Sequence, residues 1–257
     1  TMKFIFELFL YQPLFNLFVS IYNVVPDVGA AIVILTIIVK LALHPFTSKS
    51  VIAQKALQDL QPKLAEIKKK HKGDQQAIAQ ETMALYKENK VNPFGSCLPI
   101  LIQLPVFLAL YWVLRAGLTT DNFDLLYSFV ANPGSINTFT IGGIDLSVPN
   151  VYLAVMAGLA QFWQAKTMST KKAPKAAGDG AADEDTMAMV NKQMLYFMPV
   201  ITVFIGMSFP GGLALYWFLS TLFTAAHQQI VFKKKSTNKD TNAKDKKDGV
   251  IEGKIVD

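Results

Sequence analysis

Two long segments of this chain, residues 94–114 and residues 213–232, carry no charged side chain at all. Apolar runs of about 20 residues match the hydrocarbon thickness of a lipid bilayer. Of all 257 residues, 51% are hydrophobic and only 17% are charged, whereas ordinary globular domains have roughly 25% charged residues. The sequence therefore predicts a protein that crosses a membrane several times, and it excludes a soluble enzyme built around one large core.

Five segments are candidate membrane spans, and each must be helical because lipid offers the backbone no hydrogen-bond partners. We expect an all-α fold: a polytopic helical membrane protein with five core transmembrane helices, an N-terminal interfacial helix and a cytoplasmic helical hairpin. The candidate spans are residues 28–46, 94–114, 148–165, 194–209 and 213–232. The expected organisation is an amphipathic interfacial helix (1–27), a first core span (28–47), a cytoplasmic helical hairpin (48–92), core spans two to five (93–232) with an outer loop (117–147) and a cytoplasmic loop (166–192), and a basic disordered cytoplasmic tail (233–257).

Lysine is distributed unevenly over the connecting segments. Segments 48–92 and 166–192 and the tail from residue 233 are rich in lysine, whereas connectors 117–147 and 210–212 contain neither lysine nor arginine. Short loops that carry lysine and arginine remain on the cytoplasmic side of a membrane. The sequence thus predicts that the lysine-rich segments and the C-terminus are cytoplasmic.

Residues 4–25 are long enough to span a bilayer but contain several polar side chains. At about 100° per residue, four of these fall on one narrow face: Gln12, Asn16, Ser20 and Asn23. Such a face is typical of a helix that lies in the membrane interface, and we expect an in-plane helix on the outer side. A sixth span and an uncleaved signal-like segment remain alternatives, because a lysine precedes the apolar run.

Residues 48–92 have the pattern of a helical hairpin. Apolar residues recur at three- and four-residue spacing in the first arm: Leu57, Leu60, Leu64 and Ile67. Gly73 occupies a position for ending the first helix and Asp74 one for capping the second, while Pro62 is expected to kink or break the first arm. A solvated spacer between two spans is the alternative.

Residues 167–185 and 236–257 have low-complexity or strongly charged composition with few large apolar side chains. Segments of this kind bury too little apolar surface to offset the entropy of ordering. We expect both to be disordered in isolation.

Motifs for enzymatic chemistry are absent from the sequence. It has no P-loop and no glycine-rich dinucleotide fingerprint. His44, His71 and His227 lie in separate segments without metal-ligand spacing, and Cys97 is the only cysteine, so no disulfide can form within the chain. We expect no catalytic residue, no cofactor and no metal, and the protein is not predicted to be an enzyme.

Lys40 is the only charged residue in the first core span. Counted back from Phe46, it lies roughly 9 Å below the cytoplasmic boundary, where a lysine costs free energy unless it has a partner. One interpretation is that it snorkels to the headgroup layer. The other is that it lines a polar site inside the membrane.

Other polar side chains gather in the same, cytoplasmic half of the predicted spans. They are Gln103, Gln161, Thr202 and Thr224, with Thr36 and Ser220 closer to the midplane. If these groups face one another, they describe a water-accessible cavity that is open to the cytoplasm and contains one positive charge. The alternative is that each forms a hydrogen bond across one helix pair.

Tyr216 and Trp217 lie three or four residues into the fifth predicted span. Aromatic residues at this depth are typical of anchors at the membrane interface. A role in lining a site is the alternative.

Three segments of the chain resemble the YidC-type membrane protein insertase family, also called the YidC/Oxa/Alb family. QETMALYKENKVNPFGSCLPILIQLPVFLALYWVL (Gln80–Leu114) is similar to the family's most distinctive segment, FPGGLALYWFLS (Phe209–Ser220) to its last hairpin, and IIVKLALHPF (Ile37–Phe46) to its first core span. The resemblance covers about residues 28–232. It implies the core five-span form without the large extracytoplasmic domain of many Gram-negative members.

The resemblance also implies a positively charged, hydrophilic groove that is open to the cytoplasm and to lipid and closed outside. Lys40 takes the place of the groove's basic residue, which is usually arginine in the family, and Trp217 stands where a second tyrosine is frequent. Residues that match groove or substrate-contacting positions are Thr36, Gln103, Phe107, Tyr216 and Trp217. Taken together, the depth of the polar residues and the resemblance predict these groove residues: Lys40, Thr36, Gln103, Phe107, Gln161, Thr202, Tyr216, Trp217, Ser220 and Thr224.

The function implied by this resemblance is insertion and folding of small hydrophobic membrane proteins without nucleotide hydrolysis. The polar part of a nascent membrane protein would enter the groove, while its apolar segment would slide into the lipid bilayer along the third and fifth spans. The basic tail could contact the ribosome without reading a specific nucleic-acid sequence, and the Sec translocon is a further candidate partner. The expected location is the bacterial plasma (inner) membrane. A membrane chaperone or assembly subunit without translocation activity and, less favoured, a transporter or channel are the alternatives.

Overall fold

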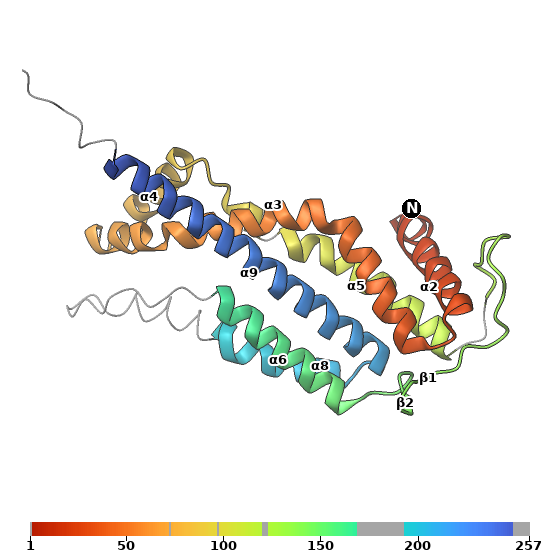
Figure 1. Cartoon of the computed structure of the whole chain (residues 1–257). Helices are drawn as coiled ribbons and strands as arrows, with labels where there is room; N and C mark the ends of the chain where they lie inside the picture. The colour runs from red at the N-terminus through yellow and green to blue at the C-terminus, as the bar shows by residue number, and fades with distance from the viewer. Residues whose placement is uncertain (1, 72, 97, 120–122, 169–192, 249–257) are drawn as a thin grey trace, which may run out of the picture.

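The computed structural model describes residues 2–71, 73–96, 98–119, 123–168 and 193–248, which form an almost entirely helical chain (Figure 1). The helices are α1 (Met2–Phe6), η1 (Glu7–Tyr11), α2 (Gln12–Val24), α3 (Val28–Lys70), α4 (Gln75–Glu88), η2 (Pro93–Ser96), α5 (Leu98–Thr119), α6 (Val151–Met168), η3 (Gln193–Phe197), α8 (Met198–Gly206) and α9 (Gly211–Asp248). Strands β1 (Phe139–Thr140) and β2 (Ile144–Asp145) pair antiparallel. The predicted all-α class is confirmed, with one short pair of strands added between α5 and α6.

Two helical stretches among the described residues, Phe4–Val24 and Val28–Lys70, are long and apolar enough to cross a membrane. Two shorter apolar helices, Leu101–Gly117 and Leu195–Gly206, accompany them. The number of spans stays a prediction. So does the placement of the N-terminal helix in the membrane interface.

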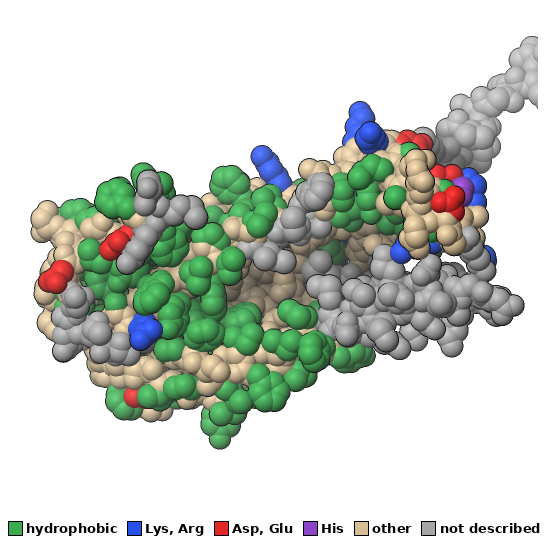
Figure 2. Space-filling view, turned by 180° about the vertical axis from the view of Figure 1, so that it is seen from behind, with side chains coloured by type: hydrophobic (Ala, Val, Ile, Leu, Met, Phe, Trp, Pro, Cys, Tyr) green, Lys and Arg blue, Asp and Glu red, His purple; other side chains and the backbone are tan. Residues whose placement is uncertain are grey.

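Hydrophobic side chains cover much of one face of the helical part (Figure 2). Leu101, Leu159 and Phe204, from three different helices, are each 64% exposed. Monomeric soluble proteins rarely expose apolar patches that extend over several elements. This surface therefore suits a lipid environment.

Helix α9 lies between two groups of helices (Figure 1). On one side it packs against α6, which in turn packs against α8, and on the other side it contacts α3 and α5. The main hydrophobic core joins α2, α3, α5 and the start of α9 with the segment between α5 and α6. The arrangement brings side chains of α3, α5 and α9 together in the interior.

Helix α3 is continuous over 43 residues and includes both the first predicted span and the first arm of the hairpin. Pro45 and Pro62 lie inside it, where each removes one backbone hydrogen bond. The neighbouring turns keep their bonds, so the predicted division at residue 47 is not a break in the helix. Of the two outcomes expected at Pro62, a kink or a break, the continuous helix excludes the break.

The hairpin between α3 and α4 forms as predicted. Gly73 has a positive φ of 85°, which glycine adopts without steric cost. The Asp74 side chain accepts hydrogen bonds from the backbone N–H groups of Gln76 and Ala77 and so caps α4. Leu64 and Leu85, from the two arms, belong to a small separate core.

Ion pairs at the tip of the hairpin join its two arms. Lys70 Nζ and His71 Nε2 each lie 2.8 Å from Glu81 Oε1. The hydrogen bonds from Lys70 and then His71 hold the pKa of Glu81 below its usual value. The Lys70–Glu81 pair is exposed, so water screens it and it adds little stability.

The polar face of the N-terminal helix holds the segment that follows α5. Asn16 Nδ2 donates to the Leu125 carbonyl at 2.9 Å, and the Tyr127 backbone N–H donates to Asn16 Oδ1 at 2.6 Å. Further along the helix, Asn23 Nδ2 donates to the Ala131 carbonyl at 2.7 Å. The stripe that predicted an interfacial helix therefore has a packing role.

Asp27 ties the start of α3 to the strand pair. Its carboxylate accepts the Ala30 backbone N–H at 2.7 Å, the Thr140 hydroxyl at 2.8 Å and the Ile141 backbone N–H at 2.6 Å. A side chain at position 29 would collide with Thr140, which explains the glycine there. One carboxylate thus serves as both helix cap and loop clamp.

Helices α6 and α9 extend beyond their predicted ends. Helix α6 continues to Met168, and the rest of the predicted cytoplasmic loop, residues 169–192, lies outside the described residues. Helix α9 continues to Asp248, past residue 233 where the basic tail was expected to begin. The disorder of that tail in isolation stays a prediction. Lysine has high helix propensity, so a helix that leaves the apolar region can continue into a lysine-rich segment. Residues 249–257 lie outside the described part.

We predict that Asp27→Ala loosens the strand pair and lowers the stability of the protein by about 1–2 kcal/mol, the usual cost of losing an N-cap. The measurement is hydrogen exchange of residues 139–145 together with thermal unfolding in detergent. Asp74→Ala, which removes a matched cap in the hairpin, is the control. Equal exchange at residues 139–145 in wild type and Asp27→Ala would refute the clamp.

The pH dependence of this clamp follows from the charge of Asp27. Burial raises the pKa of Asp27, but the hydrogen bonds from Ala30, Thr140 and Ile141 outweigh it and hold the pKa below its usual value. The clamp is therefore complete above the unfolded-state pKa of about 3.9 and is lost as pH falls through the lower folded-state pKa. Protection of residues 139–145 that begins to fall near pH 6 would contradict this assignment.

Candidate functional site: a buried lysine among three helices

Lys40 is buried in the interior, with 5% of its surface exposed. Its Nζ donates to Gln103 Oε1 of α5 and to Thr224 Oγ1 of α9, both at 3.2 Å. Within the described ranges no acidic side chain forms an ion pair with it. Lys40 therefore points inward to neutral polar partners, and the snorkelling interpretation does not describe its geometry.

The partners of Lys40 are themselves held by hydrogen bonds. Gln103 Nε2 donates to the hydroxyl of Tyr216 at 2.6 Å, and Tyr216 is 2% exposed. Thr224 Oγ1 donates to the carbonyl of Ser220 at 2.8 Å. We call Lys40, Gln103, Tyr216 and Thr224 the lysine cluster.

Helical spacing positions the members of the lysine cluster. Tyr216, Ser220 and Thr224 recur every four residues along one face of α9, so they form a polar row about 12 Å long. Lys40 and Gln103 approach this row from α3 and α5. The amide of Gln103 bridges the lysine and the tyrosine because it offers both an acceptor and donors.

Three of the predicted groove residues make their hydrogen bonds elsewhere. The hydroxyl of Thr202 in α8 donates to Gln161 Oε1 in α6. Thr36 Oγ1 donates to the carbonyl of Ile32 in its own helix at 2.6 Å. For Gln161 and Thr202 the structure thus shows a bond across one helix pair, which was the alternative to a shared cavity.

Phe107 and Trp217 pack beside the lysine cluster. Their ring centroids lie 5.3 Å apart in an edge-to-face arrangement, and Phe107 also contacts Phe209 at 6.1 Å. Phe107 follows Gln103 by four residues, so it lies one turn nearer the C-terminal end of α5. The aromatic contacts join α5 to α9 next to the lysine cluster.

A histidine pair nearer the lysine-rich side was not foreseen. The rings of His44 and His227 lie 4.8 Å apart, and the Ser48 hydroxyl is 3.3 Å from His44 Nε2 and 3.2 Å from His227 Nε2. The four-residue spacing of His44 and Ser48 on a helix was a readable signal. The approach of His227 from α9 had no signal in the sequence.

The described residues contain no group of three or more His, Cys, Asp or Glu side chains placed to hold a metal ion. The cluster can instead supply one positive charge and a few neutral hydrogen-bonding groups. Groups of this kind are suited to binding polar or anionic groups in an apolar setting.

The helical fold, the exposed apolar surface and a buried cation held by three helices together define a polytopic membrane protein with an internal polar site. Comparison with known proteins agrees with this class. The family model described as "60Kd inner membrane protein" matches residues 20–239. The chain therefore belongs to the 60Kd inner membrane protein family.

Two relatives carry the name membrane protein insertase YidC. The chain is 34% identical to that of Haemophilus influenzae over 227 residues, which is 88% of this chain and 37% of the relative. It is 36% identical to that of Fusobacterium nucleatum over 210 residues, which is 82% of this chain and 88% of the relative. The chain thus spans little more than a third of the Haemophilus protein and most of the Fusobacterium one.

A solved structure of an active YidC insertase, with its first transmembrane domain resolved, has a similar fold. The TM-score is 0.56 at 26% sequence identity, and the match covers 84% of this chain and 44% of that one. The resemblance inferred from the sequence motifs is therefore confirmed at the level of family and fold.

We predict that Lys40→Met leaves the thermal unfolding midpoint in detergent unchanged or raises it. Methionine has a similar length and avoids the cost of burying a charge, and such replacements of buried ionic groups are often neutral or stabilising. Thr202→Val, which removes the bond to Gln161, is the control and is expected to cost about 1 kcal/mol. A clear loss of stability in Lys40→Met would mean that the lysine is structural.

Proposed function

We propose that this chain is a membrane protein insertase, which inserts small hydrophobic membrane proteins and helps them fold. The proposal draws on the names of the relatives and on the lysine cluster. In it, the cluster lies in a groove that is positively charged, open to the cytoplasm and to lipid, and active without nucleotide hydrolysis.

The observation that carries the proposal is the buried amino group of Lys40 without an acidic partner among the described residues. A charge inside a membrane protein costs free energy and marks a functional site by default. A structural ion pair would include a carboxylate of the chain itself. Here the missing anion is supplied by the substrate.

The first step is entry of the substrate's polar segment, which is often acidic, into the groove. Its carboxylate pairs with Lys40, while Gln103, Tyr216 and Thr224 offer hydrogen bonds to its backbone. Each such partner lowers the cost of taking a polar group out of water. The remaining apolar distance that the segment must cross is shorter as a result.

The second step is transfer of the substrate's hydrophobic segment into lipid along α6 and α9. Exposed apolar side chains on these helices, such as Leu159 (64%) and Ile230 (66%), provide a path of lipid-like character. Burial of apolar surface contributes about 25 cal/mol per Å². The membrane potential adds about 2.3 kcal/mol per charge per 100 mV.

Lysine at position 40 keeps the charge of the arginine that is usual in the family. It offers a compact ammonium in place of the planar fork of arginine. The ammonium therefore attracts the anion without fixing its orientation, and Gln103 and Thr224 orient it instead. Arginine at this position would retain the function.

The proposal places the protein in the bacterial inner membrane with its lysine-rich segments and C-terminus in the cytoplasm. The substrates are nascent hydrophobic membrane proteins. The basic end of α9 is proposed to meet the ribosome through nonspecific electrostatic attraction. The Sec translocon is a further proposed partner.

The test is insertion of a short single-span protein with an acidic N-terminal tail into liposomes that contain only this purified chain. Protection of the tail from protease measures insertion. We predict that wild type and Lys40→Arg protect the tail, while Lys40→Met lowers protection at least tenfold. A tenfold loss corresponds to about 1.4 kcal/mol, which is within the range for one hydrogen-bonded charged group.

Two controls make the outcome readable. A substrate with a neutral tail should depend little on Lys40, because it brings no anion. Thr202→Val should protect the tail like wild type, because it lies outside the lysine cluster. Substrate that binds without protection above empty liposomes would support a chaperone without translocation activity in place of an insertase.

A further inference from the structure

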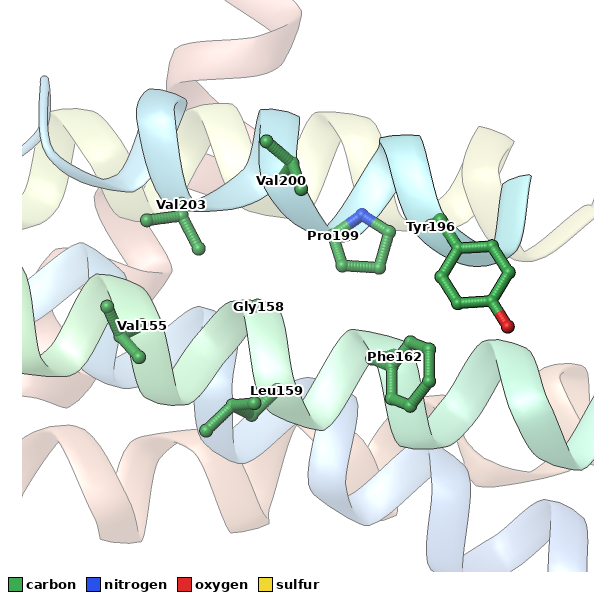
Figure 3. Close-up of a pocket in the computed structure, with 8 residues that line it drawn as sticks. All are labelled: Val155, Gly158, Leu159, Phe162, Tyr196, Pro199, Val200 and Val203. Atoms are coloured by element: carbon green, nitrogen blue, oxygen red, sulfur yellow. The ribbon is translucent and has the colours of Figure 1, made fainter. Parts of the chain in front are cut away.

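An apolar crevice runs between α6 and the η3–α8 segment (Figure 3), and no residue of the lysine cluster lines it. It has a volume of about 280 Å³. Val155, Leu159 and Phe162 of α6 line it on one side, and Tyr196, Val200 and Val203 line it on the other (Figure 3). Leu159 also belongs to the path proposed for the substrate's hydrophobic segment, but the interior of the crevice has no role in that mechanism.

Small residues bring the two walls together. An added Cβ at Gly158 would lie 3.0 Å from the carbonyl oxygen of Pro199, and one at Gly206 would lie 3.0 Å from Ala154. The two helix backbones therefore approach closely at Gly158 and Gly206, and larger side chains beside these contacts form the walls of the crevice. The crevice thus results from the packing of this helix pair.

The dimensions of the crevice decide what can occupy it. From Val155 to Phe162 it is seven residues, or about 10 Å, long, compared with about 15 Å for one leaflet of hydrocarbon. A helix segment of that length and about 10 Å in diameter needs about 800 Å³. A volume of 280 Å³ suits a single acyl chain and is too small for a transmembrane helix.

Polar groups are confined to one end of the crevice. The hydroxyl of Tyr196 points past Phe162 toward the end of α6 that carries Lys166 (Figure 3). Lys166 is exposed and follows Phe162 by four residues, so it continues the same helix face. A cation and a hydroxyl at the mouth of an apolar slot match the headgroup and chain of an anionic phospholipid.

We propose that the crevice between α6 and α8 binds one anionic phospholipid. Its acyl chain lies between Leu159 and Val200, and its phosphate lies near Lys166 and the hydroxyl of Tyr196. The lipid fills the gap beside the Gly158 contact and stabilises the α6–α8 pair. This proposal concerns a different surface from the lysine cluster and does not depend on insertase activity.

The test uses the full chain in liposomes that contain a phospholipid with a photoactivatable acyl chain, either phosphatidylglycerol or phosphatidylcholine. Cross-linked peptides from α6 and α8 are counted by mass spectrometry. Wild type is expected to react more with phosphatidylglycerol. Val200→Trp, which fills the crevice from an exposed position, should lower the yield at least fivefold.

Matched variants separate this site from general lipid contact. Ile205→Trp, on the opposite side of α8, should leave the yield unchanged. Lys166→Gln should reduce the preference for phosphatidylglycerol about fivefold, the effect of one lysine near an anionic surface, whereas Lys63→Gln in the hairpin should not. Equal losses in Val200→Trp and Ile205→Trp, or cross-linking without any headgroup preference, would overturn the proposal.

Discussion

Every polar group inside a membrane must find its partner within the protein, and the lysine cluster satisfies this requirement with side chains from three helices. Lys40, Gln103 and Tyr216 hold α3, α5 and α9 in one relative position. Because lipid competes for none of these bonds, the cluster fixes an interior arrangement that apolar packing alone leaves loose. The same bonds position the amino group of Lys40 without giving it an anion of its own, so the geometry of the site and its binding capacity have one origin.

Much of the fold could be predicted from the sequence because it depends on local signals. Apolar runs and lysine asymmetry indicated the helical membrane class, and Gly73 and Asp74 marked the turn of the hairpin. Predictions of where helices end were weaker. Helix α3 continues through Pro62 because the neighbouring turns keep their hydrogen bonds. Helix α9 continues to Asp248 because lysine has a high helix propensity, which outweighs the change in polarity.

Contacts between distant segments could be predicted only in part. The gathering of Lys40, Gln103 and Thr224 followed from their similar depth in the predicted spans. Depth alone does not fix the rotation of a helix, so it could not separate them from Gln161 and Thr202, which bind each other. The meeting of His44 with His227 and the crevice beside Gly158 depend on side-chain packing between helices, for which the sequence carries no simple pattern.

The continuity of α3 has a mechanical consequence. A helix of 43 residues is about 65 Å long. It carries the hairpin core at one end and the Asp27 clamp at the other, and Lys40 lies about 18 Å from the Asp27 end. A displacement of the hairpin is therefore transmitted along one continuous helix to the lysine cluster. Pro45 and Pro62, where the backbone ladder lacks a bond, are the positions at which this helix can bend most easily.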